Sequence, residues 1–209
     1  MDSLSHALIG IAVGGLSGHS FSLTDPIYLA TILGAQSPDF DIIAQLKGRF
    51  SYLRQHRAFS HSILGLILWS ALIGLALDFF IPETNFLSFA GWAFAGSLSH
   101  SIIDYFNTHG AAILWPFCKK RKSMELLNVF DPILFILMIS LYLFDLTMFE
   151  QSICTFSIIV SYIILRMLLR QKAKKQLQHL FATQEIIKIT VMPSLKRILF
   201  WDFVVETVN

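Results

Sequence analysis

Long runs of apolar residues, separated by short polar segments, fill the first 169 residues of the chain. Three runs approach or exceed the roughly 20 apolar residues that a helix needs to cross the hydrocarbon core of a bilayer. They cover residues 62–81, 126–149 and 153–169. A fourth run, 87–106, is apolar for two thirds of its length and then carries His100 and Asp104. This pattern predicts a bundle of helices that crosses a membrane several times.

Two shorter apolar segments, 7–16 and 27–35, precede these runs and are separated by a predicted turn at Asp25-Pro26. Each is interpreted as either a half-depth helix or a tightly packed short span. Glycine recurs at every fourth position in and after the first segment, at Gly10, Gly14 and Gly18. A stripe of this kind lets another helix backbone approach closely, so we expect tight packing there. The alternative is a flexible apolar stretch.

The pattern changes after the last run. Residues 171–183 are predicted to form a solvated helix, and 186–192 and 198–205 carry the β-branched and aromatic residues typical of strands. We therefore expect a membrane-embedded domain over 1–169 and a cytoplasmic tail over 170–209. Because the chain ends as a β-rich region begins, the tail is expected to be a truncated product or a fragment.

The composition fits a membrane protein and excludes several other classes. Hydrophobic residues make up 55% of the 209 residues and charged residues only 14%, against about 25% in soluble domains. The net charge of +2 is too small for a nucleic-acid binder that relies on a basic field, so no such partner is expected. Cys118 and Cys154 lack the spacing of a metal or redox pair and are interpreted as reduced. The expected fold is an all-α integral membrane protein, a polytopic helical bundle with a short C-terminal β-prone segment in the cytoplasm.

The charges of the loops predict how the bundle is oriented. Basic side chains gather at 47–57, 119–122 and 170–175, whereas the loops at 82–85 and 150–151 carry none. Basic and non-basic loops alternate along the chain, and basic loops stay in the cytoplasm. We therefore expect a multi-pass protein of the inner or plasma membrane with these three basic loops on the cytoplasmic side.

Ionisable residues stand at the ends of the apolar segments, where a membrane makes them costly and each becomes a functional candidate. Asp2 and His6 are four residues apart, as are His100 and Asp104, so each pair projects from one helix face. Further carboxylates and imidazoles lie beside apolar segments, at Asp39, Asp41, His56 and His61. Under the predicted orientation these candidates, together with Asp131, fall at the cytoplasmic ends of their segments. This coincidence predicts a single site facing the cytoplasm.

Neutral imidazoles and carboxylates without thiolates suit zinc, and also manganese or iron. More than four candidate ligands indicate two divalent ions, which can activate a water and stabilise the leaving oxygen of a phosphoester. Arg57 is suited to hold phosphate oxygens with its planar guanidinium group. Other interpretations stay open, since a single membrane histidine is often a packing group. Asp39, Asp41 and Asp131 can equally be helix caps.

Taken together, these residues form motifs that are similar to those of a known family. They are Asp2-x-x-x-His6, Pro38-Asp39-x-Asp41, His56-Arg57-x-x-Ser60-His61, Ser99-His100-x-x-x-Asp104, Asn107-Thr108 and Trp115-Pro116. Over residues 1–135 and 201–207 the chain resembles the bacterial membrane-bound metal-dependent hydrolases of the YdjM/YfhP group, whose motif order is similar to that of zinc-dependent phospholipases C. The resemblance implies metal ligation by His6, Asp39, His56, His61, His100 and Asp104. Two departures are Ala58, where relatives commonly have Gly, and the tail, which runs further in relatives.

The expected function is a metal-dependent, zinc-type hydrolase that cleaves a phosphoester in a lipid or amphiphilic substrate at the cytoplasmic membrane surface. Asp41 or Asp39 would orient the attacking water, and Arg57 would stabilise negative charge. Supporting roles around the ligands are expected for Asp2, Ser60, Thr108 and Asp131. The alternative is a non-catalytic metal-binding membrane protein that staples its helices or binds a regulatory partner. Metal transport is the weaker third interpretation, because the polar groups stop at one side. The sequence leaves the substrate and the oligomeric state open.

Overall fold

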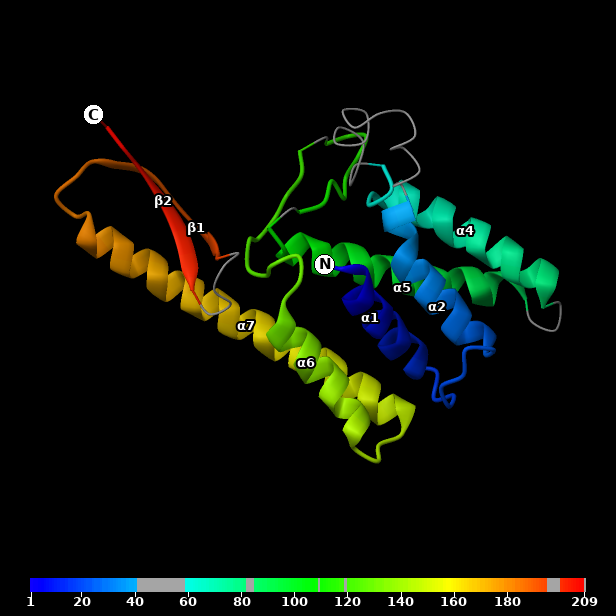
Figure 1. Cartoon of the computed structure of the whole chain (residues 1–209). Coiled ribbons are helices and arrows are strands. Elements are labelled where there is room, and N and C mark those ends of the chain that lie inside the picture. Colours follow the sequence, from blue (N-terminus) through cyan, green and yellow to red (C-terminus); the bar gives the residue numbers. More distant parts are fainter. Residues whose placement is uncertain (41–58, 82–84, 109, 119, 195–199, 209) are drawn as a thin grey trace.

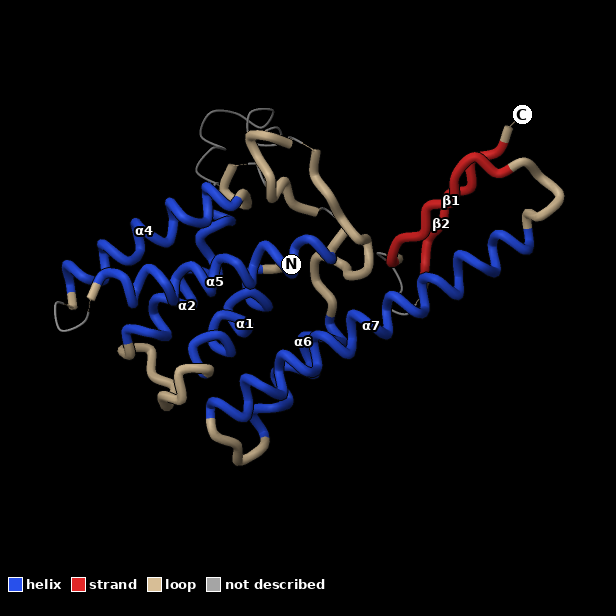
Figure 2. The backbone as a smooth tube through the Cα atoms, turned by 180° about the vertical axis from the view of Figure 1, so that it is seen from behind, coloured by secondary structure: helices blue, strands red, loops and turns tan. Residues whose placement is uncertain are grey.

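The structure, a computed structural model, describes residues 1–40, 59–81, 85–108, 110–118, 120–194 and 200–208. It is mostly helical, with a small two-stranded sheet near the C-terminus (Figure 1, Figure 2). The helices are α1 (Ser3–Gly15), α2 (Pro26–Gln36), α4 (Ile63–Phe80), α5 (Phe86–Phe106), α6 (Pro132–Ser140), which continues into a 3₁₀ turn (Leu141–Leu143), and α7 (Met148–Leu180). Among the described helices, α4, α5 and α7 are long and apolar enough to cross a membrane. The predicted spans at 62–81 and 87–106 are thus confirmed as helices, and the two short apolar segments form α1 and α2.

The central helix of the bundle is α5, which packs against α1, α2 and α4 (Figure 1). Its crossing with α2 is close because each helix contributes a glycine. A Cβ atom on Gly34 would lie 2.2 Å from the Ala93 carbonyl oxygen. A Cβ atom on Gly96 would lie 2.2 Å from the Thr31 carbonyl oxygen. Because any side chain at these two positions would push the helices apart, the glycines set how near α2 comes to α5.

The glycine stripe predicted for the first helix is confirmed at two of its three positions. Gly10 and Gly14 both face α2, and a Cβ atom on Gly14 would lie 2.7 Å from the Tyr28 ring. The prediction is wrong for Gly18, because α1 has already ended and Gly18 adopts a φ of 80° in the following turn. Glycine is favoured at this third position by the backbone conformation and not by helix packing.

The predicted span at 126–149 is wrong, since its helical parts are α6, the 3₁₀ turn that follows and the first two residues of α7. Pro132 occupies the first turn of α6, and proline at this position is typical of a helix start. Leu126 and Leu127 come before the helix and are fully buried. Their N–H groups donate to the Phe106 carbonyl at 2.9 and 3.0 Å. These apolar residues therefore contribute to the protein core and not to a membrane-spanning helix.

The longest helix, α7, has 33 residues, whereas the sequence predicts a span at 153–169 and a separate helix at 171–183. A capping box formed by Thr147 and Glu150 begins it. At about 1.5 Å per residue it is roughly 50 Å long, against about 30 Å for a hydrocarbon core. One continuous helix is therefore long enough to cross a bilayer and to project well beyond it.

The predicted strands are confirmed as an antiparallel pair, β1 (Ile186–Pro193) and β2 (Trp201–Thr207). The pair lies alongside the C-terminal half of α7 (Figure 2). The Arg166 guanidinium carbon lies 4.3 Å from the centre of the Trp201 ring. Arg170 Nε donates to the Val191 carbonyl at 2.9 Å. Since two strands alone are marginally stable in water, α7 supplies the surface that supports this sheet.

Candidate metal centre

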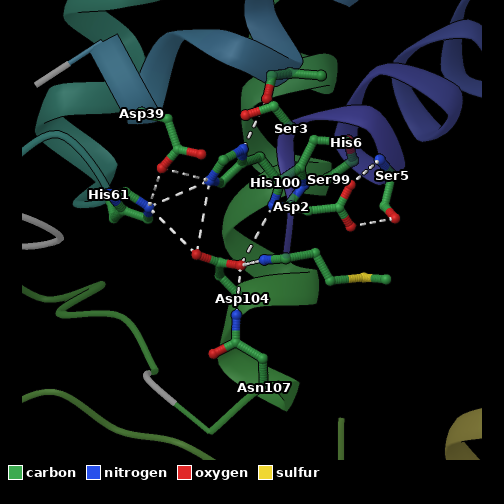
Figure 3. Close-up of polar contacts among 12 residues, drawn as sticks. Asp2, Ser3, Ser5, His6, Asp39, His61, Ser99, His100, Asp104 and Asn107 are labelled. Atoms are coloured by element: carbon green, nitrogen blue, oxygen red, sulfur yellow. Dashed lines mark hydrogen bonds and ion pairs between the residues drawn. The ribbon is translucent and has the colours of Figure 1, made fainter. Parts of the chain in front are cut away.

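Ionisable side chains from four segments of the chain meet at one end of the helical bundle (Figure 3). The contributing residues are His6 near the start of α1, Asp39 in the turn after α2, His61 just before α4, and His100 and Asp104 near the end of α5. A four-residue spacing on a helix places His100 and Asp104 on the same face of α5. The five residues that the sequence predicts to gather are therefore neighbours, although they are up to 98 positions apart in the chain.

Four donor atoms form the centre of this cluster. His61 Nε2 lies 3.2 Å from His100 Nε2 and 3.4 Å from Asp104 Oδ2. Asp39 Oδ1 lies 3.7 Å from both of these imidazole nitrogens, and His100 Nε2 lies 3.7 Å from Asp104 Oδ2. Ligands at about 2.1 Å from a tetrahedral ion are separated from one another by about 3.4 Å. The spacing of the His61, His100 and Asp104 atoms therefore fits three ligands of one zinc-sized ion, and Asp39 lies beside the two imidazoles.

His6 stands on the opposite side of the Asp104 carboxylate. Its Nε2 lies 3.3 Å from Asp104 Oδ1, and its ring stacks on His100 with centroids 3.6 Å apart. His6, Asp39 and His100 also bring donor atoms within 4.8 Å of one another. Among the described residues, the buried Nδ1 of His6 has no hydrogen-bond partner, and Nε2 has the Asp104 carboxylate as its ion-pair neighbour. Because burying a ring nitrogen without a partner is costly, His6 fits a ligand to a bound cation.

Hydrogen bonds hold the candidate ligands from outside the cluster. His100 Nδ1 lies 2.7 Å from the Ala35 carbonyl oxygen, which can only accept, so the proton of the imidazole resides on Nδ1. The lone pair of His100 Nε2 is then directed into the cluster, as in many metal sites. Asn107 Nδ2 donates to Asp104 Oδ1 at 2.6 Å. The predicted supporting residue Ser60 places its hydroxyl oxygen 3.1 Å from Nδ1 of the neighbouring His61.

The cluster is deeply buried except at one side. The side chains of His6, His61, His100 and Asp104 have no exposed surface, whereas that of Asp39 is 24% exposed. The cluster is therefore closed by the helices of the bundle and open to solvent at Asp39. A closed set of ligands is typical of structural metal sites, whereas catalytic sites keep one position accessible.

The other predicted site residues have different surroundings. Asp2 is the N-cap of α1, and Asp131 is the N-cap of α6 and accepts a hydrogen bond from the Tyr162 hydroxyl at 3.0 Å. The capping role that the sequence leaves open for Asp131 is therefore present. The N–H group of Thr108 donates to the Leu127 carbonyl at 3.1 Å. Three further residues with predicted roles, Asp41, His56 and Arg57, lie outside the described residues.

Three groups in contact with the cluster are absent from the set predicted by sequence. The buried terminal ammonium group of Met1 donates to Asp104 Oδ1. Ala35 acts through its backbone carbonyl, for which the sequence carries no side-chain signal. Asn107, in contrast, follows Asp104 by three residues and caps the end of α5. Its position in the Asn107-Thr108 motif is the signal that could have identified it.

Comparison with known proteins identifies the family of the chain. The sequence matches the YdjM inner membrane protein family over residues 1–173. It is also 31% identical over 205 residues to the uncharacterized protein YfhP of Bacillus subtilis (strain 168), an alignment that covers 94% of this chain and 62% of that protein. The chain thus spans about three fifths of the length of this relative. No solved structure matches the chain. Since the family match covers most of its residues, the chain belongs to the YdjM inner membrane protein family.

Proposed function

We propose that the protein is a membrane-bound, metal-dependent hydrolase of a phosphoester in a lipid or amphiphilic substrate. The observation that carries this proposal is the spacing of 3.2–3.7 Å among donor atoms of His61, His100 and Asp104, with Asp39 3.7 Å from both imidazoles. Imidazole and carboxylate donors favour zinc, with manganese or iron as alternatives. Two ions are part of the proposal because His6, Asp39 and His100 form a second group of donor atoms within 4.8 Å of one another.

Divalent ions bound here would polarise a phosphoryl oxygen and lower the pKa of a water molecule. The chain itself would contribute by orienting its ligands before substrate arrives. Ala35 fixes the proton of His100 on Nδ1, and Asn107 holds one oxygen of Asp104. Asp39, the exposed member of the cluster, is placed where water and substrate would enter. Asp41 and Arg57 are neighbours in sequence of the ligands and remain predicted to orient water and bind phosphate.

The depth of the cluster favours a membrane lipid over a water-soluble substrate. At about 1.5 Å per residue, His100 and Asp104 lie about 9 Å and 3 Å before the last residue of α5. With 21 residues, α5 is about as long as the hydrocarbon core is thick. The cluster would therefore lie close to the boundary between the acyl chains and the headgroups, where the phosphoester of a lipid is located. On the loop-charge argument, this boundary is the cytoplasmic one.

The competing proposal is a non-catalytic protein in which the metal only joins α1, α2, α4 and α5. The grouping of the donor atoms in threes favours hydrolysis, because catalytic zinc sites have three protein ligands and leave the fourth position to water or substrate. Measurement of metal content together with turnover separates the two. We expect the purified full chain to hold stoichiometric transition metal and to hydrolyse members of a panel of phospholipids and phosphodiesters, and His100→Ala to lose both properties.

His19→Ala is the matched control, because His19 is an exposed histidine that pairs with Asp25 at 2.9 Å in the loop before α2. This variant should keep the metal and the turnover of the unmodified chain. Metal retention without turnover of any phosphoester would support the stapling role and reject the hydrolase. Absence of metal from the unmodified chain under non-chelating conditions would reject both.

A further inference from the structure

An apolar groove runs along the outside of the bundle between α5 and α7. Helix α1 packs against both of these helices (Figure 1). It contributes Ile9 to the floor of the groove. The walls include Ile102 and Phe106 from α5, and Val160 and Ile164 from α7. The groove encloses about 300 Å³, which is at the lower end of the range for small-ligand sites.

The lining of the groove is suited to hydrocarbon. Ser99 is the only polar residue that lines it within the described part of the chain. The Ser99 hydroxyl donates to the Gly96 carbonyl at 2.7 Å, so its hydrogen bond is made within α5. A polar ligand group would lose its hydrogen bonds to water in this groove and gain few in return, which is unfavourable. An alkyl chain would lose none.

The position of the groove indicates where such a chain would come from. Both walls belong to helices that are long and apolar enough to span a bilayer, and Val160 and Ile164 are about half exposed on the outer surface. The groove therefore opens sideways toward the acyl chains of the membrane. It also lies at the depth of the metal centre, because Ile103 in its wall is adjacent to Asp104 and Ile9 is three residues from His6.

We propose that this groove binds one acyl chain of a bilayer phospholipid at the depth of the metal centre. Binding of the chain can be measured without turnover, so it is tested separately from the proposed function. The proposal commits to a bilayer lipid because the groove is continuous with the lipid-facing surface of α5 and α7. The groove would favour lipids that carry a long chain, since each buried methylene group contributes to binding.

Neighbouring residues of α7 provide a matched pair of variants for the test. Ile164 lines the groove and is 47% exposed, whereas Leu165 does not line it and is 49% exposed. The full chain is placed in nanodiscs of phosphatidylethanolamine and phosphatidylglycerol, with a phosphatidylglycerol that carries a photoreactive diazirine on one acyl chain. Labelled peptides are then mapped by mass spectrometry. We expect labelling at 99–106 and 156–164. Ile164→Trp should reduce this labelling about tenfold, which corresponds to the loss of about two buried methylene groups. Leu165→Trp should leave it unchanged.

Val160→Phe is a milder variant that fills the same groove, and the metal content of each variant reports whether the bundle remains folded. Equal labelling of these positions in the groove variants and in Leu165→Trp would mean that only unselective boundary lipid is present, and would overturn the proposal. Groove-dependent labelling in a protein that hydrolyses no phosphoester would support the acyl-chain site while rejecting the proposed function.

Discussion

At the scale of single residues, the cluster is defined by which nitrogen of His100 carries the proton. The Ala35 carbonyl accepts from Nδ1 at 2.7 Å, so Nε2 faces His61 Nε2 at 3.2 Å with a lone pair. Asn107 acts in a similar way on Asp104, since its amide donates to one oxygen at 2.6 Å. Hydrogen bonds of this kind orient ligands and are worth about 10–100-fold in metal affinity.

Replacement of Asn107 tests this supporting role without removing a ligand. We expect Asn107→Ala to lower zinc affinity by about 10–100-fold, because Asp104 loses a donor that fixes its orientation. Affinity is measured by competition with a chromogenic chelator. Asn128→Ala is the control, since Asn128 is also buried but donates to the Ser194 carbonyl at 3.2 Å. Unchanged affinity in Asn107→Ala, or an equal loss in both variants, would contradict the role assigned to Asn107.

The sequence predicts the members of the cluster better than the groups that hold them. His6, His61 and Asp104 can be identified because each is an ionisable group at the end of an apolar segment, and a membrane tolerates few such groups. Ala35 cannot be identified in this way, because it acts through a carbonyl that every residue possesses. For Asp131 the sequence leaves a capping role open, since Pro132 follows it, and the structure has that cap.

At the scale of elements, the position of α2 against α5 determines whether the cluster can form. α2 carries the Ala35 carbonyl and leads into the turn with Asp39, while α5 carries His100 and Asp104. The two helices approach closely because Gly34 and Gly96 lack side chains. Helix packing and the geometry of the cluster are therefore coupled, and a change at the crossing is expected to alter metal binding.

Two alanine substitutions on α5 test this coupling. A Cβ atom on Gly96 would lie 2.2 Å from the Thr31 carbonyl oxygen and 3.0 Å from Ala35 N, whereas a Cβ atom on Gly91 would have no neighbour within 4 Å. We expect Gly96→Ala to lower the free energy of unfolding by about 1–3 kcal/mol and to weaken metal binding. Gly91→Ala should leave metal binding unchanged and raise stability by about 0.5–1 kcal/mol. Thermal unfolding in detergent and metal titration would measure both effects, and equal behaviour of the two variants would contradict the coupling.

A helix or strand is predicted correctly from sequence where its pattern of apolar or β-branched residues has a single physical cause. The spans at 62–81 and 87–106 and the two strands are recovered because hydrophobic length or β-branching reports them directly. The prediction fails at 126–149, where Leu126 and Leu127 are apolar because they are buried beside the end of α5. Hydropathy has the same sign for burial in protein and in lipid, so it cannot separate these two causes.

At the scale of the whole molecule, the bundle has one polar end and one end without such a cluster among the described residues. The start of α4 and the end of α5 lie at the polar end, together with the start of α1 (Figure 1). The sheet packs against the far half of α7, which reaches well past the length needed to cross a bilayer. The combined length of α6 and its 3₁₀ turn is only about 20 Å, which is less than the thickness of a hydrocarbon core. Whether α6 carries the chain across therefore determines which side of the membrane holds the sheet.

Cysteine labelling at three positions tests this arrangement in a variant that lacks the native cysteines, Cys118→Ser/Cys154→Ala. The alternation of basic loops predicts that Asn85→Cys reacts with a membrane-impermeant maleimide in intact spheroplasts, because the loop between α4 and α5 is external. Phe117→Cys and Leu180→Cys should react only after the membrane is opened. Both native side chains are exposed, at 92% and 72%, so poor accessibility would not explain protection.

Protection at both positions requires that the segment from α6 to α7 crosses the membrane twice despite the shortness of α6. Labelling of Phe117→Cys from outside would place the metal centre at the external face. Labelling of Leu180→Cys alone would show that α6 turns back without crossing and that the sheet is external.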